Sequence, residues 1–452
     1  MLNNEKAFTN EENMFLKGPI LPPLMRFAIP ILLALILQAM YGAVDLWVVG
    51  QFCGSADISA VATGSQTMLI LTGIITGLSM GTTILLAQKI GENNFQSAAH
   101  VIGSSIWIFT ILSLLLSAIM LFTAPSIAMI MNAPEEALEK TIHYIRICAS
   151  GTVFIAAYNV LSSIFRGLGN SKLPLLFVTI ACITNIIGDL LFVKVLHMDA
   201  AGTAYATVLA QAVSVILSLL IMKKKGFPFP FTKKHLSLHP AIIKKILKLG
   251  APIALQDMCN EFSYLVLIGL VNALGLTASA GVGIAERLVM FMVLIPMAYM
   301  FSISAFVAQN IGAKQPGRAK RAMWLGMSTA AVFSIIMFYI SFFHGDLLSA
   351  IFSPDPAIIA ASSDFLKATA IECLILSIAY CFTGYFNGLG KSTFVMVQGL
   401  LAIFLVRIPY AYLASKSANP SLFEIGLSAV AAAGFSLIVC VVYYNLREKK
   451  EK

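Results

Sequence analysis

Long apolar runs recur from residue 24 to residue 444, separated by short polar connections. A run of ~20 apolar residues crosses the ~30 Å hydrocarbon core of a bilayer as a helix, whereas strands of a membrane barrel have ~10 residues of alternating polarity. The pattern therefore predicts an all-α polytopic membrane protein. We place twelve transmembrane helices at residues 24–49, 58–85, 100–123, 141–165, 173–194, 200–222, 250–273, 279–308, 322–343, 363–385, 393–414 and 424–445.

The composition excludes a soluble globular protein, because 59% of the 452 residues are hydrophobic and 11% are charged, against ~25% charged residues in soluble domains. The seven cysteines are odd in number, lack a CxxC motif and lie mostly in apolar runs, so we expect core residues rather than disulfides. The polar first 20 residues show no cleavable signal peptide, so the first transmembrane helix is expected to direct insertion.

The basic residues predict the orientation of the chain. Most of the 30 lysines and arginines lie in the two tails and in the connections that follow even-numbered helices. By the positive-inside rule, both termini of this multi-pass protein are expected in the cytoplasm, with the chain in the plasma or inner membrane. The net charge of +9 is thus mainly an orientation signal, and we expect no nucleic-acid partner.

Two short motifs repeat at one offset of 221 residues. Residues 87–91 (AQKIG) recur at 308–312 (AQNIG), and residues 165–171 (FRGLGNS) recur at 386–392 (FNGLGKS). Because six helices are an even number, the two copies share one orientation, as in parallel-repeat transporters. The repeat predicts two six-helix bundles, and we divide the chain into a cytoplasmic tail (1–23), an N-lobe (24–222), a basic linker (223–248), a C-lobe (249–445) and a second cytoplasmic tail (446–452).

Residues 384–392 (GYFNGLGKS) nearly spell a phosphate-binding loop, but Tyr385 stands where that motif requires glycine. The segment is better interpreted as a tight turn between helices. Without a nucleotide site, any pumping is expected to be driven by an ion gradient. No histidine, cysteine or serine constellation indicates catalysis or a transition-metal site, so we expect neither an enzyme nor a cofactor.

Acidic residues inside the membrane indicate function, because a charge in hydrocarbon costs several kcal/mol. Asp45 and Asp189 both lie ~6–8 Å below the outer boundary at a rise of 1.5 Å per residue. Asn185 is one turn before Asp189, and Thr203 and Thr207 enter at a comparable level. We expect one oxygen-rich pocket for a proton or a sodium ion. The alternative is that each aspartate merely reaches the interface from a helix end.

A second acidic region is expected near the midplane of the C-lobe. Glu261 and Glu372 lie about nine to eleven residues from a membrane face, with Asp257 one turn before Glu261. One alternative is that such a buried glutamate is simply protonated and hydrogen-bonded to a neighbour. Another is that Arg407 neutralises Glu372, which weakens the case for a cation site there. These four residues are the candidate substrate or cation cavity, whereas neighbouring Glu286 and Arg287 are expected at the outer interface.

Pro30 interrupts the helix that carries Asp45 and invites a kink there. The equivalent position in the second repeat lies near Pro252. We expect Pro30 to act as a hinge that links ion binding to helix bending, although structural kinks of this kind are common.

These features resemble the multidrug and toxic compound extrusion (MATE) family over essentially the whole chain. The resemblance is carried by residues 30–50 (PILLALILQAMYGAVDLWVVG), residues 184–189 (TNIIGD) and the paired glycine turns after the fourth and tenth helices. It is best to the DNA-damage-inducible protein F type subgroup. The resemblance implies export of organic cations by antiport against protons or sodium ions.

In that subgroup the resemblance implies an ion site formed by Tyr41, Asp45, Asn185, Asp189 and Thr207. No metal is expected beyond a possible sodium ion at Asp45, Asn185, Asp189 and Thr207. Glu261 resembles the acid on the seventh helix of the sodium-coupled subgroup, whereas the acid on its tenth helix falls about one turn from Glu372.

The main alternative is a flippase of the same superfamily that moves a lipid-linked oligosaccharide or a peptidoglycan precursor. Such an anionic cargo favours a basic cavity, but the only basic residues well away from the ends of the predicted helices are Arg407 and Arg287, against at least four acids within the helices. A sensor or channel without coupled transport is a further alternative. We expect a monomer whose partners are small organic cations and the lipid bilayer.

Overall fold

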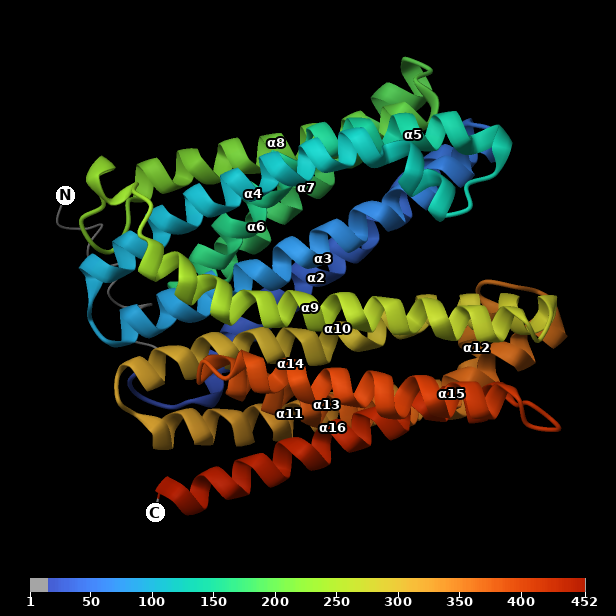
Figure 1. The fold of residues 1–452 in the computed structure, drawn as a ribbon. Helices are drawn as coiled ribbons and strands as arrows, with labels where there is room; N and C mark the ends of the chain where they lie inside the picture. The colour runs from blue at the N-terminus through green and yellow to red at the C-terminus, as the bar shows by residue number, and fades with distance from the viewer. Residues whose placement is uncertain (1–14, 452) are drawn as a thin grey trace. The chain divides into compact units, whose positions relative to one another are not determined.

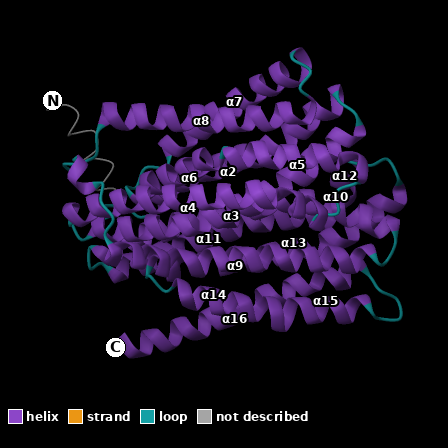
Figure 2. Ribbon diagram, turned by 45° about the horizontal axis from the view of Figure 1, so that its top comes forward, coloured by secondary structure: helices purple, strands orange, loops and turns teal. Residues whose placement is uncertain are grey.

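The computed structural model describes residues 15–451, and every regular element in that range is helical (Figures 1 and 2). The first half contains α2 (Leu21–Phe52), α3 (Ser55–Gly91), α4 (Phe95–Ile130), α5 (Glu135–Ser150), α6 (Thr152–Gly167), α7 (Lys172–Asp189), η1 (Leu190–Val195) and α8 (Asp199–Lys225). After the short η2 (Lys233–His235), the second half contains α9 (Pro240–Asn272), α10 (Leu276–Gly312), α11 (Pro316–Phe343), α12 (Gly345–Ala350), α13 (Pro356–Gly388), α14 (Ser392–Leu401), η3 (Ala402–Arg407), α15 (Ile408–Ser415) and α16 (Leu422–Glu451).

The all-α fold predicted from the sequence is confirmed. Within the described range, ten helices are long and apolar enough to cross a membrane, and the bent pair α5 and α6 supplies an eleventh span. α9 covers the range predicted for the seventh span and carries three lysines, one aspartate and one glutamate. It begins at Pro240 inside the predicted linker, because proline suits the first turn of a helix and the lysines that follow are good helix formers.

Three of the spans are broken. α5 and α6 meet at an angle of 49° next to Gly151, where a Cβ atom would lie 2.4 Å from Val208. The fifth and eleventh spans each contain a π-helical segment, η1 directly after Asp189 and η3 ending at Arg407. Such segments are rare and frequently occur at functional sites. Two predicted site residues therefore border irregular backbone.

The chain forms two compact units. The N-terminal unit contains Ile29–Ala254 and Gly312–Lys314, and the C-terminal unit contains Pro19–Ala28, Leu255–Ile311 and the residues from Gln315 onward. Three helices are divided between the units. In α2 and α9 the division lies within two residues of a proline, Pro30 and Pro252, and in α10 only the last residue, Gly312, belongs to the N-terminal unit. The first 14 residues of the predicted cytoplasmic tail and Lys452 lie outside the described residues.

In the N-terminal unit, α3 packs on α4, α5 and α6, while α7 packs on α8. Glycines allow close helix contacts, because a Cβ atom at Gly81 would lie 2.3 Å from the carbonyl oxygen of Ile246 on α9. Small residues that let backbones approach are typical of membrane helix interfaces. In the C-terminal unit, α13 packs on α11 and α16.

The segment between α8 and α9 is held against α4. Trp107 Nε1 donates a hydrogen bond of 3.2 Å to the carbonyl of Leu236, and Ser104 Oγ donates one of 3.2 Å to the carbonyl of Ser237. The rings of His100 and His239 join through a hydrogen bond of 2.8 Å between Nδ1 and Nε2. The connection predicted as a linker is therefore docked on the N-terminal unit.

Candidate functional site

Asp45 on α2 and Asp189 at the end of α7 are both buried, with 3% and 0% of their surface exposed. The two carboxylates lie close enough to interact electrostatically. Thr207 on α8 donates a hydrogen bond of 3.3 Å from Oγ1 to Asp45 Oδ2. Asn185 Nδ2 in turn donates one of 3.5 Å to Thr207 Oγ1. Three helices thus bring four predicted ion-site residues into one buried pocket, as their matched depths in the sequence indicate.

Several oxygens in this pocket are buried without a hydrogen-bond partner among the described residues. They are Asp45 Oδ1, both carboxylate oxygens of Asp189, Asn185 Oδ1 and the hydroxyl of Tyr41. Buried polar atoms normally have partners, and two adjacent buried carboxylates repel one another unless a positive charge compensates them. The site is thus suited to hold a proton or a small cation.

Local packing explains why α7 and α8 present these side chains together. Asn185 and Asp189 are one helical turn apart and share a face. Gly188 lies between them, and a Cβ atom at Gly188 would lie 3.0 Å from that of Ala206. Ala206 precedes Thr207 in α8, so the close contact of the two backbones brings the threonine hydroxyl within reach of Asn185.

Tyr144 on α5 is a wall residue of this pocket that the sequence analysis missed. Its side chain is 2% exposed and interacts electrostatically with Asp45 and Asp189. The ring lies against Gly64 on α3, where a Cβ atom would be 2.2 Å from Tyr144 Cδ1. The sequence offers one weak signal, a tyrosine within the outer half of the fourth predicted span.

Thr203 differs from Thr207. It is fully buried, and its hydroxyl donates a hydrogen bond of 2.9 Å to the carbonyl of Ala200 within its own helix. In the described part of the chain it forms no hydrogen bond with either aspartate. The structure therefore brings together Tyr41, Asp45, Asn185, Asp189 and Thr207. The hydroxyl of Thr203 instead bonds to the backbone of its own helix.

The predicted C-lobe residues also gather in one unit. Asp257 and Glu261 lie on α9, Glu372 on α13 and Arg407 at the end of η3, and the last two are 8% and 5% exposed. Arg407 interacts electrostatically with Glu372 and with Glu261. The prediction that Arg407 offsets the charge of Glu372 agrees with this proximity.

The structure separates two neighbours that were expected together at the interface. Arg287 is exposed. Glu286 is half-buried, its Oε1 atom is inaccessible to solvent, and it interacts electrostatically with Arg407. Adjacent residues of a helix point about 100° apart, so the two side chains differ in exposure, and their place at the outer interface stays a prediction.

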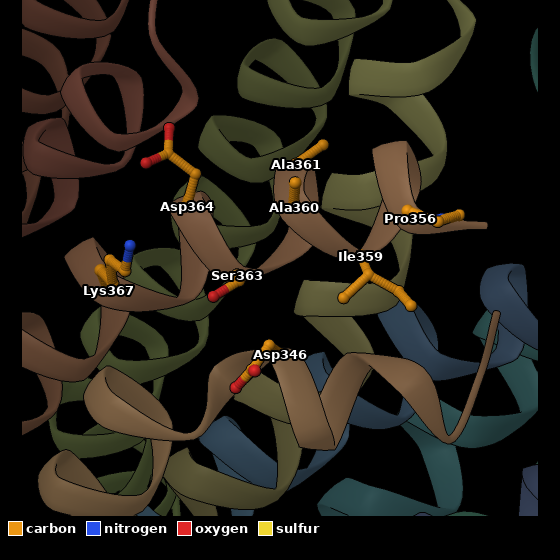
Figure 3. A pocket seen from close by; sticks show the side chains of 8 residues that line it. All are labelled: Asp346, Pro356, Ile359, Ala360, Ala361, Ser363, Asp364 and Lys367. Atoms are coloured by element: carbon orange, nitrogen blue, oxygen red, sulfur yellow. The ribbon is translucent and has the colours of Figure 1, made fainter. Parts of the chain in front are cut away.

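An open cavity of about 680 Å³ lies between α12 and α13 (Figure 3). Asp346 on α12 lies across it from Ser363 and Asp364 on α13. Asp364 has a structural role, because its Oδ2 accepts hydrogen bonds from the hydroxyl of Ser421 and the backbone N–H of Phe423 at the start of α16. We therefore do not place the functional site here.

Among the described residues, no group of three or more histidine, cysteine, aspartate or glutamate side chains has the arrangement of a metal site. The candidate carboxylates thus form a buried pair in the N-terminal unit and a looser set around Arg407 in the C-terminal unit, where Glu372 is buried and Asp257 and Glu261 are exposed.

Comparisons with known proteins agree with this architecture. The model of the MatE family matches residues 30–191 and residues 252–413. The chain is 27% identical to the probable multidrug resistance protein YpnP of Bacillus subtilis (strain 168), covering 95% of this chain and 96% of that protein. It is 25% identical to the multidrug export protein MepA of Staphylococcus haemolyticus (strain JCSC1435), covering 89% and 88% of the two chains.

Solved structures show the same fold. A MATE transporter in an outward-facing conformation superposes with a TM-score of 0.90 at 21% identity, covering 97% of this chain and 98% of that one. A MOP superfamily transporter from Pyrococcus furiosus superposes with a TM-score of 0.90 at 20% identity, covering 96% and 97%. The fold is that of a polytopic all-α membrane protein with two compact units. With family matches in both halves, the chain belongs to the MATE family of efflux transporters.

Proposed function

We propose that this protein exports amphipathic organic cations in exchange for protons or sodium ions. The observation that carries the proposal is the buried pair of Asp45 and Asp189, with Thr207 hydrogen-bonded to Asp45 and Asn185 hydrogen-bonded to Thr207. The multidrug names of its relatives support the drug-like cargo. The acids of the C-terminal unit support a preference for cations, because among the described residues of that unit Arg407 is the single buried arginine or lysine.

The acid pair is suited to coupling because its charge must be compensated in a dry environment. An imposed gradient supplies ~1.4 kcal/mol per pH unit, and a membrane potential supplies ~2.3 kcal/mol per 100 mV for each charge moved. Only a group that alternates between occupied and empty states uses this energy. A proton or a sodium ion at Asp45 and Asp189 meets that requirement.

We propose alternating access as the transport cycle, with both termini in the cytoplasm and one chain as the transport unit. Ion binding shifts the inward-open and outward-open populations only through its different affinity for the two states. Pro30 lies next to the point where α2 passes from one compact unit to the other, and Pro252 has the corresponding place in α9. This placement supports a hinge at Pro30.

The test is transport in proteoliposomes with proton and sodium gradients imposed independently. We expect Asp45→Asn and Asp189→Asn each to abolish gradient-driven efflux of a cationic dye while the protein still inserts. Asp346→Asn is the matched control, because that aspartate is exposed at the cavity beside α12. Efflux at the wild-type rate in either pocket variant would refute the coupling role.

A further inference from the structure

Arg407 is a buried cation surrounded by acids from three other helices. It interacts electrostatically with Glu286 on α10 and Glu372 on α13, and Glu261 on α9 interacts with it in turn. Its guanidinium carbon lies 3.9 Å from the centroid of the Tyr264 ring. All of these residues belong to the C-terminal unit.

The arginine is not locked into an ion pair. Among the described residues, no carboxylate oxygen lies within 4.0 Å of a guanidinium nitrogen of Arg407. Arg407 Nε and Glu286 Oε1 are both buried without a hydrogen-bond partner in this part of the chain. A buried arginine usually closes a two-pronged pair with a carboxylate, since an unpaired buried charge is strongly unfavourable. The acids here attract the guanidinium electrostatically but form no ion pair with it.

The position of the guanidinium shows which chemistry the site accepts. A planar, delocalised and weakly hydrated cation lies on an aromatic face, with carboxylates on the neighbouring helices. The same combination of an aromatic face and carboxylates binds a planar organic cation. We propose that Arg407 is a displaceable counter-cation, which such a ligand replaces over Tyr264 when it binds among Glu261, Glu286 and Glu372.

This inference deepens the proposed function, on which it rests for the class of cargo. Without Arg407, the buried carboxylate of Glu372 and the half-buried carboxylate of Glu286 would have no compensating charge beside them, and this is unfavourable in a low-dielectric interior. The arginine supplies that charge until a ligand arrives. Because it also competes with the ligand, it sets the affinity of the site and favours cations that stack better than a guanidinium does.

Equilibrium binding to purified protein in lipid nanodiscs tests the inference, with ethidium as the planar cation and its neutral diaminophenylphenanthridine core as the analogue. We expect Arg407→Gln to tighten ethidium binding about tenfold, because a like charge beside the ligand is removed. Glu286→Gln is expected to weaken it about tenfold for the opposite reason. Binding of the neutral core is expected to change by less than about twofold in both variants.

Arg287→Gln is the matched control, because it removes the same charge from the exposed side of α10. We expect it to leave ethidium binding unchanged. Guanidinium ion at low millimolar concentration is expected to weaken ethidium binding to the Arg407→Gln variant and to leave the wild type unaffected. Arg407→Lys, which keeps the charge but loses the flat stacking surface, is expected to tighten binding about threefold.

Two results would overturn the inference. One is unchanged or weaker ethidium binding in both Arg407 variants while they keep the wild-type thermal stability. The other is an equal change for ethidium and for the neutral core. The binding measurement uses no ion gradient. A negative result here would therefore not contradict the coupling role of Asp45 and Asp189, and a negative result in the coupling test would not contradict the binding result.

Discussion

Thr207 on α8 donates a hydrogen bond of 3.3 Å to Asp45 on α2, across 162 residues of sequence. It also accepts a hydrogen bond from Asn185, so one hydroxyl links the two helices that carry the buried aspartates. The threonine therefore positions the carboxylate of Asp45 within the pocket. This relationship makes the pocket testable without removing either acid.

Thr207→Val is expected to lower gradient-driven efflux by about five- to tenfold, because a hydrogen bond to a charged group contributes about 1.5 kcal/mol or more. Thr207→Ser keeps the hydroxyl and is expected to retain most of the activity. Initial efflux rates at a limiting gradient measure both. Equal rates in the valine variant and the wild type would contradict the role of Thr207.

Gly64→Ala is expected to destabilise the protein by about 1–3 kcal/mol and to impair coupling, because overpacking displaces neighbouring side chains. The added methyl group would lie 2.2 Å from the ring of Tyr144, which borders the acid pair. Gly73→Ala on the same helix is the control, since nothing lies within 4 Å of the new atom. Thermal unfolding in detergent and gradient-driven efflux measure the two effects, and identical behaviour of the two variants would show that the contact is unimportant.

Lys140→Met is expected to destabilise the N-terminal unit by about 1–3 kcal/mol, because it leaves the buried carboxylate of Asp57 without its cation. Lys140 Nζ donates to both carboxylate oxygens of Asp57 at 2.7 Å. Its contact with Asp199 is longer, at 3.6 Å, and that aspartate is exposed. Asp199→Asn is therefore expected to change the unfolding temperature much less, and a reversed order of the two variants would contradict this account.

Gly103→Ala is expected to release the segment between α8 and α9 from α4. The new Cβ atom would lie 1.9 Å from the carbonyl oxygen of His235, a backbone atom that cannot move alone. His239→Ala removes the hydrogen bond with His100 and is expected to have a smaller effect in the same direction. Limited proteolysis within residues 226–239 measures the release. Unchanged cleavage in the glycine variant would mean that the segment docks through other contacts.

Pro30→Ala is expected to slow the exchange between inward-open and outward-open states, because the restored helix hydrogen bond resists bending of α2. Spin labels at the outer ends of α2 and α9 are expected to report a distance change when substrate is added or when pH or sodium is changed. Normal transport and normal switching in the variant would make the proline structural. A single fixed distance in a transporting protein would exclude alternating access by movement of the two units.

The length and spacing of the apolar runs determined the fold class, because a bilayer imposes the length of each helix. Depth in the membrane is also readable from the sequence, since each residue of a helix adds a fixed rise. Asp45, Asn185, Asp189 and Thr207 were therefore predicted together before their contacts were known. A repeated offset further indicated two bundles from sequence alone.

Only the tertiary structure decided which neighbours complete the sites, because rotation of a helix about its axis depends on packing against other helices. Tyr144 faces the acid pair because Gly64 leaves room for its ring. Thr203 bonds to its own helix although it shares the depth of the pocket. Glu286 turns toward Arg407, whereas its neighbour Arg287 stays exposed. The sequence sets the depth of a side chain, and the packing of the helices sets the direction in which it points.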